Sequence, residues 1–445
     1  MDSFFLRAIT NELQEVLKGA RISKISQPKK EVLLLELSAL TGGTKRLLIS
    51  CEAGYPRLHL TGSSFPSLPT PPAFCSSLRK HLLGSRISSL SQKGLERVVE
   101  IAAEKRDSMG RVRRYSLMCE VMGRWSNLIL VESRTGLILD ALKLFGRSKS
   151  RERPIIRNLP YKLPPTQGRL NPLATEREAF EKGLRLKRAS PSPERMKSRL
   201  LALFEGLSPG AAKAIVDRVP ENSRWGSLWE AFRQTMEEFR EGRFEPHILL
   251  DEEGVDYLQI SALAAPGVAP ECLLPFESAN EAAETFYKGV EEREAMRAVR
   301  ESLMGVLSRA LRKKNRILKL LARDLKVSER AEEFRERGEL LLAHLKGLPR
   351  GMEEVRLKAD GREVVIALDP RLDGLANAQK YFKRYKKLKR LKSFGERRQK
   401  AIESEVAYLQ GVELALRDAA RVEDMEEIAR ELEEAGYIKK EGKKR

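Results

Sequence analysis

Hydrophobic residues in the last third of the chain repeat every three or four positions along two long stretches. In the first stretch they recur from Leu303 to Leu325, with charged residues at most other positions. In the second, a matching series begins at Phe382 and continues to Ala419. This spacing is typical of helices that pack along one side. We therefore predict two long helices, the arms of one antiparallel hairpin, with residues 338–376 forming a tip between them.

The predicted arms are long, and the tip between them carries a second pattern. An arm of about 45 residues would reach roughly 65 Å at 1.5 Å per residue. Within the tip, two short apolar segments at residues 355–358 and 363–368 flank Asp360-Gly361. An Asp-Gly pair between two such segments is a strong signal of a β-hairpin. The sequence thus predicts a small β tip on a long coiled coil.

The first part of the chain, residues 1–175, shows the shorter alternation that is typical of strands. An amphipathic helix is expected at the N-terminus and another near residues 73–83. Strands are expected at residues 21–26, 31–37, 45–50, 56–60, 86–92, 97–103, 114–121, 127–131 and 137–142. Turn residues separate these segments. The pattern predicts an α+β domain dominated by antiparallel strands.

After this domain the pattern changes twice more. Arg147, Lys149, Arg151, Arg153 and Arg157 form a basic, extended strip. Residues 176–245 are predicted to be helical, with Gly206-Leu207-Ser208-Pro209-Gly210 joining two short helices as in a helix-hairpin-helix unit. The N–H groups after such a turn can hold a phosphate, although many turns of this kind only connect helices. Three further segments are predicted. Residues 246–278 return to the first domain, residues 279–436 form the coiled-coil domain, and residues 437–445 form a basic tail.

Charge narrows the possible functions of the 445-residue chain. The net charge is +20, the isoelectric point is about 9.8 and 33% of residues are charged. Such a balance points first to nucleic acid and second to an anionic membrane surface. Eleven Lys or Arg lie between Lys380 and Lys400 against one acid, Glu396. No apolar run is long enough for a membrane span, and the N-terminal pattern is not that of a signal peptide. We expect a cytoplasmic protein with no membrane partner.

Residues that commonly carry chemistry are scattered. The four cysteines and four histidines form no paired or clustered motif, so we expect no metal site and no disulfide framework. Walker loops, dinucleotide fingerprints, nucleophile elbows and HExxH sequences are absent from the sequence. The pattern favours a binding protein without cofactor, small-molecule substrate or catalytic residues.

Short motifs follow one another in order along nearly the whole chain. They include Thr10-Asn11-Glu12-Leu13, Gly94-Leu95-Glu96-Arg97, EVMGRWSN at 120–127, Asn171-Pro172-Leu173, Leu368-Asp369-Pro370 and Asn377-Ala378-Gln379. In this order they resemble the NFACT family, whose bacterial members are of the RqcH or FbpA type and whose eukaryotic relative is NEMF. The resemblance implies an NFACT-N domain with a fold like that of formamidopyrimidine glycosylases, a helix-hairpin-helix domain and a middle coiled coil. Full-length relatives continue into an NFACT-R domain, which we expect this chain to lack.

The resemblance also implies a role in ribosome-associated quality control. A protein of this kind binds the large ribosomal subunit that still carries a stalled peptidyl-tRNA, and it contacts ribosomal RNA. It holds a tRNA, for which alanine tRNA is expected, and supports untemplated C-terminal tailing of the nascent chain. The ribosome forms the peptide bonds, so the protein itself is not an enzyme.

Two sets of residues are implied as contacts by the resemblance. For tRNA they are Glu96, Arg97, Glu120, Val121, Met122, Arg124, Trp125 and Asn127. For the ribosome and its RNA we assign Lys383, Arg384, Lys386, Lys387, Lys389 and Arg390. The family usually has Asp where Glu96 stands and His where Trp125 stands. Without the resemblance, Glu96 and Arg97 could form an exposed ion pair, and Trp125 could either stack on a base or fill a core.

Two other functions remain open from the sequence. Some relatives carry a fibronectin-binding label, which raises the alternative of a surface adhesin. The resemblance to glycosylases raises a DNA-binding enzyme, but those enzymes use an N-terminal proline followed by a glutamate. This chain begins Met1-Asp2-Ser3, which disfavours base excision.

Overall fold

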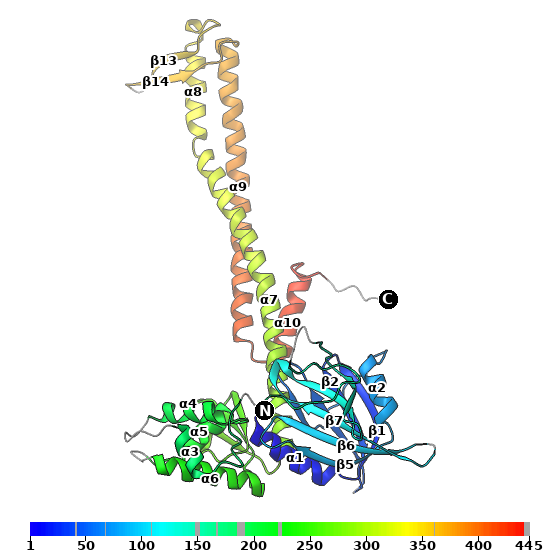
Figure 1. The fold of residues 1–445 in the computed structure, drawn as a ribbon. Helices are drawn as coiled ribbons and strands as arrows, with labels where there is room; N and C mark the ends of the chain where they lie inside the picture. The colour runs from blue at the N-terminus through cyan, green and yellow to red at the C-terminus, as the bar shows by residue number, and fades with distance from the viewer. Residues whose placement is uncertain are drawn as a thin grey trace. The chain divides into compact units, whose positions relative to one another are not determined.

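The computed structural model describes residues 1–40, 42–66, 68–107, 109–146, 152–165, 168–184, 192–220, 225–359 and 361–439. Arg147, Lys149 and Arg151 of the basic strip, Asp360 of the predicted turn and residues 440–445 of the predicted tail lie outside them. The chain divides into two compact units, unit 1 (Met1–Glu291) and unit 2 (Glu292–Arg445). Each unit is described by itself below (Figure 1).

In the described residues, unit 1 contains a nine-stranded antiparallel sheet with the order β4-β3-β2-β1-β5-β6-β7-β8-β9. The strands are β1 (Arg21–Lys29), β2 (Val32–Ser38), β3 (Thr44–Ser50), β4 (Arg57–Leu60), β5 (Arg86–Gln92), β6 (Val98–Arg106), β7 (Val112–Glu120), β8 (Asn127–Glu132) and β9 (Leu137–Ala141). The predicted strand segments match these bounds within a few residues. β1 and β5 share one register pair, Arg21 with Arg86, so the sheet has two halves that diverge from this point.

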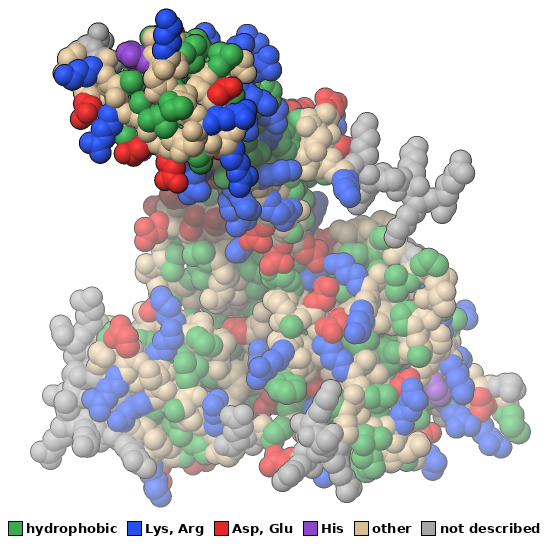
Figure 2. Space-filling view, turned by 90° about the horizontal axis from the view of Figure 1, so that it is seen from above, with side chains coloured by type: hydrophobic (Ala, Val, Ile, Leu, Met, Phe, Trp, Pro, Cys, Tyr) green, Lys and Arg blue, Asp and Glu red, His purple; other side chains and the backbone are tan. Residues whose placement is uncertain are grey.

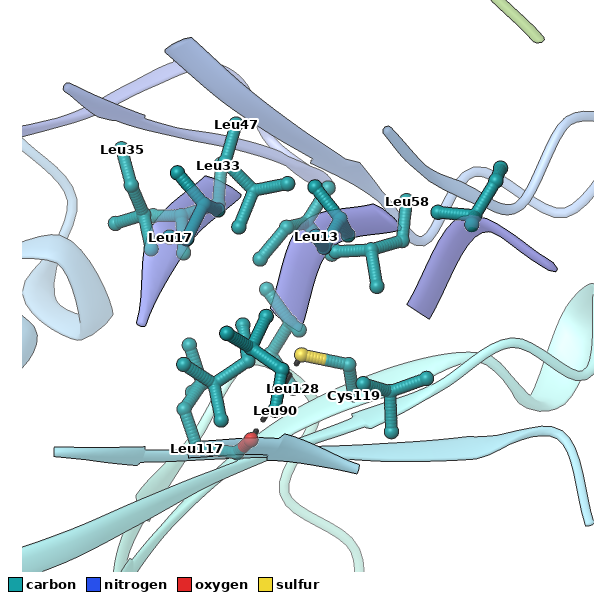
Figure 3. Packing of buried hydrophobic residues seen from close by; sticks show 14 of the residues in the cluster. Leu13, Leu17, Leu33, Leu35, Leu47, Leu58, Leu90, Leu117, Cys119 and Leu128 are labelled. Carbon is teal, nitrogen blue, oxygen red and sulfur yellow. Dashed lines mark hydrogen bonds between the residues drawn. The ribbon is translucent and has the colours of Figure 1, made fainter. Parts of the chain in front are cut away.

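The main core of unit 1 forms around helix α1 (Ser3–Leu17), which begins where Asp2 accepts a hydrogen bond from the Phe5 N–H at 2.9 Å. Figure 3 shows leucines of α1 packed between side chains from the two halves of the sheet. The labelled residues are Leu13, Leu17, Leu33, Leu35, Leu47, Leu58, Leu90, Leu117, Cys119 and Leu128. Each fully buried leucine contributes about 1.5–3 kcal/mol. Helix α2 (Ala73–Leu82) adds Leu78 and Leu82 to the same core.

A smaller helical region follows in unit 1. It comprises α3 (Arg177–Leu184), α4 (Pro193–Leu203), α5 (Pro209–Asp217) and α6 (Trp225–Glu241). Its core is aromatic, with Phe180, Phe204 and Phe232 in mutual ring contact. Phe4 of α1 contacts Phe239 of α6 with ring centroids 5.1 Å apart, which joins this region to the sheet domain.

Unit 1 closes with a three-stranded sheet and the first turns of a long helix. The strands β10 (His247–Leu250), β11 (Tyr257–Ser261) and β12 (Leu273–Pro275) pair in the order β11-β10-β12. Helix α7 (Ala279–Ser328) begins beside Glu12 of α1. The Glu12 carboxylate accepts hydrogen bonds from the Ala279 N–H at 2.5 Å and the Asn280 N–H at 3.1 Å. A side chain from α1 therefore caps the start of α7.

Unit 2 is the predicted antiparallel hairpin. Its helices are the remaining part of α7, α8 (Ala331–Ala343), α9 (Gly374–Asp418) and α10 (Val422–Glu434), and its tip holds β13 (Glu354–Ala359) and β14 (Arg362–Ala367). The buried seam includes Leu303, Leu307, Leu409 and Leu416, as the apolar repeat predicted. α10 adds a third helix to this end of the hairpin.

The outgoing arm of the hairpin is interrupted, which the sequence pattern did not predict. α7 ends at the buried Ser328, whose Oγ donates to the Leu325 carbonyl at 2.6 Å, and α8 begins three residues later. α8 packs along α9, where Gly338 allows the Phe382 ring to approach closely. Helical pairing therefore continues to Ala343, beyond the predicted start of the tip at residue 338.

Candidate functional site

A cleft of about 540 Å³ in unit 1 brings together most of the predicted tRNA-contacting residues. The segments that line it include the turn between β5 and β6, the 3-10 turn η1 (Gly123–Trp125) after β7, and the turn at residues 206–208 before α5. The lining includes Asp2, Glu96, Arg97, Glu120, Met122, Trp125, Arg153, Glu205 and Ser208. Segments far apart in the sequence thus form one site of mixed charge.

The turn before α5 is fixed against the start of α1. The Ser3 Oγ donates to the Gly206 carbonyl at 2.7 Å, and the Ser208 Oγ donates to Asp2 at 2.8 Å. Ser208 also caps α5 by accepting the Ala211 N–H at 2.9 Å. These bonds satisfy polar groups of the turn internally and hold this wall of the cleft in place.

The Glu96–Arg97 pair lies at the turn between β5 and β6, where Glu96 is half-buried and Arg97 is exposed. Burial raises the pKa of Glu96 above its ordinary value, and the nearby Glu205 carboxylate raises it further, while Arg97 opposes the shift. The Arg97 carbonyl accepts the Val121 N–H at 2.8 Å. This backbone bond ties the pair to the second predicted motif, at residues 120–127.

Glu120 is buried, and its carboxylate is engaged inside the protein. Arg153 donates to both carboxylate oxygens, through Nη1 at 3.1 Å and through Nη2, and the Tyr161 hydroxyl donates at 2.9 Å. Burial, and then the Glu120 charge, raise the pKa of Tyr161 above its ordinary value. Arg153 and Tyr161 were not among the predicted site residues, because nothing local in the sequence links them to Glu120.

Two further members of the predicted motif are buried. Val121 belongs to the main core. Asn127 connects the start of β8 to the chain after β9: its Nδ2 donates to the Lys143 carbonyl at 2.9 Å, and its Oδ1 accepts the Lys143 and Leu128 N–H groups at 2.9 Å. Their direct contact with tRNA remains a prediction, and in this structure both side chains shape the turn that presents their neighbours.

The exposed members of the motif are Arg124 and Trp125, while Met122 is half-buried at the edge of the cleft. Trp125 is 61% exposed, and the Arg124 guanidinium lies 5.1 Å from the centre of its ring. Gly123 begins this turn with φ of +58°, a conformation that suits glycine. A core-filling role for Trp125 is therefore wrong, and the ring is available for stacking.

The predicted ribosome-binding residues lie on α9. All six are exposed, namely Lys383, Arg384, Lys386, Lys387, Lys389 and Arg390. Leu388, between them in sequence, is buried in the hairpin. Figure 2 shows Lys and Arg side chains gathered beside the tip of the hairpin. The helix therefore separates an apolar packing side from a basic side.

Two kinds of feature are absent from the described part of the chain. None of the helices there combines the length and low polarity that a bilayer crossing requires. In the same residues, no three His, Cys, Asp or Glu side chains gather closely enough to hold a metal ion.

The fold and the site define an α+β protein with a cleft-bearing sheet domain, a small helical region and a long basic helical hairpin. The family described as "NFACT N-terminal and middle domains" matches residues 2–445. The chain belongs to this NFACT family.

Curated relatives extend over nearly all of this chain. The Rqc2 homolog RqcH of Bacillus subtilis is 31% identical over 443 residues, which is 98% of this chain and 75% of that protein. RqcH of Streptococcus pneumoniae R6 is 30% identical over 442 residues, covering 99% and 75%. Among solved structures, the N-terminal part of the fibronectin/fibrinogen-binding protein from Streptococcus suis matches with a TM-score of 0.54 and 28% identity. That match covers 65% of this chain and 99% of that one.

Proposed function

We propose that this protein is a cytoplasmic, ribosome-associated quality-control factor. It binds the large ribosomal subunit that carries a stalled peptidyl-tRNA, and it holds a tRNA, with alanine tRNA as the expected species, for untemplated tailing of the nascent chain. It supplies binding and positioning, and the ribosome forms the bond. The observation that carries the proposal is the cleft of unit 1, where Arg97 and Trp125 lie at one site in a chain with RqcH relatives.

The cleft can contact tRNA in two chemically distinct ways. Arg97 presents a planar set of donors that can bind a phosphate or a base edge with two parallel hydrogen bonds. Trp125, with the Arg124 guanidinium beside it, offers a surface on which an unpaired base can stack. Glu96 can accept a hydrogen bond from a base amino group when it is ionised.

The buried residues of the motif act on tRNA through their neighbours in this proposal. Glu120 holds Arg153 and Tyr161, and Asn127 fixes the start of β8. Together with Val121 in the core, they set the position of the turn that carries Arg124 and Trp125. Their substitution should change tRNA binding mainly by altering the fold.

The basic side of α9 suits the phosphate backbone of ribosomal RNA. Its six exposed cations form a dense run of one sign, which neutralises phosphates with little sequence preference. Association with the large subunit through this surface should therefore weaken steeply as salt rises.

A pair of binding assays tests the proposal. Trp125→Ala should lower affinity for purified tRNA by roughly 5- to 150-fold, the range expected for about 1–3 kcal/mol of base stacking. Leu258→Ala serves as its control, because Leu258 is 64% exposed and lies outside the cleft lining. Co-sedimentation with large subunits should persist in the Trp125 variant. Equal tRNA affinity in the two variants would contradict the assignment of the cleft.

The six α9 residues are tested by replacing all of them with Gln. This variant should lose co-sedimentation with large subunits while it retains tRNA binding through unit 1. RNA that copurifies with the wild-type chain from cells should be enriched in alanine tRNA. Recovery of no tRNA would count against the proposal.

The name of the Streptococcus suis relative supports a second candidate, an adhesin for fibronectin or fibrinogen. The two candidates differ in a direct assay. Retention on immobilised fibronectin together with failure to sediment with large subunits would favour the adhesin, whereas the opposite result would favour ribosome binding.

A further inference from the structure

The hairpin of β6 and β7 extends past the rest of the sheet. β5 pairs with β6 as far as Glu104, and β8 pairs with β7 as far as Tyr115. Beyond Glu104 and Arg114, the two strands pair only with each other in the described residues, ending with Arg106 opposite Val112. Residues 105–107 and 109–113 therefore form a two-stranded ribbon, which leaves the edge of the domain in Figure 1.

The end of this ribbon is held by hydrogen bonds within it. The Asp107 carboxylate accepts the Met109 and Arg111 N–H groups, each at 2.9 Å, and the Asp107 N–H donates to the Arg111 carbonyl at 3.0 Å. The hydrogen bond from the Arg111 N–H makes the largest contribution to lowering the pKa of Asp107. Gly110 supplies the positive φ of +77° that the turn needs. These hydrogen bonds restrict the described residues of the turn, which reduces the entropy that they would lose on binding a ligand.

The charges on the ribbon are mostly positive and only partly compensated. Lys105 lies directly opposite Arg113 on the same face, an arrangement of like charges that destabilises a strand pair. Arg113 reaches one acid, Asp107, at 3.6 Å. Arg106 and Arg111 are exposed as well. This arrangement costs the free protein stability, and a polyanion would offset the cost.

The basic surface continues onto α2. Lys80, in the last turn of α2, is exposed, and the next residue, His81, contacts the Tyr115 ring at 5.3 Å. Lys105 and Arg113 form the next pair on the strand face that carries Tyr115. Burial lowers the pKa of His81, the charges of Lys80 and Lys105 lower it further, and Asp140 and Glu132 oppose the shift. Lys80, Lys105 and Arg113 thus form one basic stripe along the helix side of the ribbon.

We propose that this ribbon is a second RNA-binding surface of unit 1, separate from the cleft, and that it contacts the phosphate backbone of a double-helical RNA stem. The inference rests on the proposed function in that the stem would belong to the bound tRNA or to ribosomal RNA. A two-stranded ribbon is narrow enough to follow a nucleic-acid groove. A-form RNA offers a wide, shallow minor groove lined by phosphates and 2′-hydroxyls.

Single-stranded RNA fits the ribbon less well. Proteins that bind single strands combine cations with exposed aromatic rings for stacking. Tyr115, which lies two residues beyond the ribbon on β7, is half-buried and contacts the His81 ring. An anionic membrane is also disfavoured, because the exposed apolar residues Met109 and Val112 are separated by Arg111 and form no broad apolar face.

The test compares two triple variants that lose the same charge. The ribbon variant is Arg106→Gln, Arg111→Gln and Arg113→Gln, and the control is Arg177→Gln, Arg195→Gln and Arg233→Gln in the helical region, where all three arginines are exposed. Binding to purified tRNA and to a short blunt-ended RNA duplex is measured across a salt series. The plot of log K against log salt has a negative slope. In the ribbon variant its magnitude should decrease by roughly 2–3, because three phosphate contacts are lost at about 0.7–0.9 each. The control should keep the wild-type slope and unfolding midpoint. The ribbon variant should unfold at or above the wild-type midpoint, because it removes the repulsion between Lys105 and Arg113.

The outcomes separate this inference from the proposed function. If the wild-type chain binds tRNA and the ribbon variant keeps the full salt slope on both probes, the ribbon inference is overturned and the proposed function stands. Ribbon-dependent binding of both the duplex and tRNA, with tRNA affinity unchanged in the Trp125→Ala variant, would support the ribbon and contradict the assignment of the cleft. A third probe is a vesicle containing phosphatidylserine. Loss of vesicle binding with unchanged RNA slopes would overturn the inference in favour of a membrane surface.

Discussion

Replacing Glu120 by Ala should destabilise unit 1 strongly. Glu120 is 2% exposed, and Arg153, its partner, has a side chain that is 13% exposed. Without the carboxylate, the buried Arg153 guanidinium loses the ion pair with Glu120 and both of its hydrogen bonds to that group. The Tyr161 hydroxyl also loses the acceptor that it contacts at 2.9 Å. Removing one partner of a buried ion pair costs about 3–5 kcal/mol, since the other charge stays buried without that partner.

Tryptophan fluorescence during chemical denaturation can measure this effect in unit 1. All three tryptophans of the sequence, Trp125, Trp225 and Trp229, precede Glu292, so the signal reports on unit 1 alone. The unfolding free energy is obtained by linear extrapolation to zero denaturant. Glu120→Gln is the matched control, because it keeps the shape and an acceptor for Tyr161 while it removes the charge. It should lose less stability than Glu120→Ala.

The competing expectation is that Glu120 contacts tRNA directly. In that case Glu120→Ala would weaken tRNA binding while the unfolding free energy stayed within about 0.5 kcal/mol of the wild-type value, as for an ordinary surface substitution. That result would refute the structural role assigned here. We expect the opposite result: Glu120→Ala lowers the unfolding free energy, and tRNA binding weakens only because the protein is less stable.

Two further predictions concern pH and backbone geometry. Burial lowers the pKa of His59 to about 4 from its ordinary 6.5, so the stability that His59 contributes is present above pH 6.5 and is lost as pH falls towards 4. His59 should contribute about 2 kcal/mol to the stability that unit 1 loses between pH 7 and pH 5, and His59→Gln should reduce the loss by that amount in denaturation curves recorded at both values. Gly206→Ala should lower the unfolding free energy well beyond the roughly 1 kcal/mol expected for Gly136→Ala. Both glycines have φ near +70°, but an added Cβ at Gly206 would lie 2.3 Å from the Leu95 carbonyl oxygen, whereas nothing lies within 4 Å at Gly136. Equal losses in the two variants would show that the contact with Leu95 is unimportant.

The sequence predicted the strands of unit 1 and the seam of unit 2 because both depend on local periodicity. Val99, Ile101 and Ala103 of β6 recur at every second position and are buried, and the repeat from Leu303 to Leu325 has the spacing of a packed helix. The break after Ser328 was missed because neither proline nor glycine marks it. Helix α10 was missed because its apolar residues continue the spacing of the preceding arm after a short turn.

The site was harder to predict because its contacts are long-range. Arg153 and Tyr161 lie 33 and 41 residues from Glu120, and no local pattern pairs them. The sequence around Trp125 does not determine whether its ring is buried or exposed. Its exposure follows from the turn at Gly123, which directs the chain out of β7 before β8 begins.

The interruption after Ser328 makes the two arms of the hairpin mechanically unequal. α9 passes this level without a break, and Gly395 lies so close to Leu325 that an added Cβ would approach it to 2.9 Å. A continuous helix is stiff because each turn is hydrogen-bonded to the next, and a break removes those ties at one level. We therefore expect the hairpin to bend at this level, where α9 is the continuous helix. A force applied to β13 and β14 would therefore rotate α8 and the tip together about the level of Ser328 and Gly395.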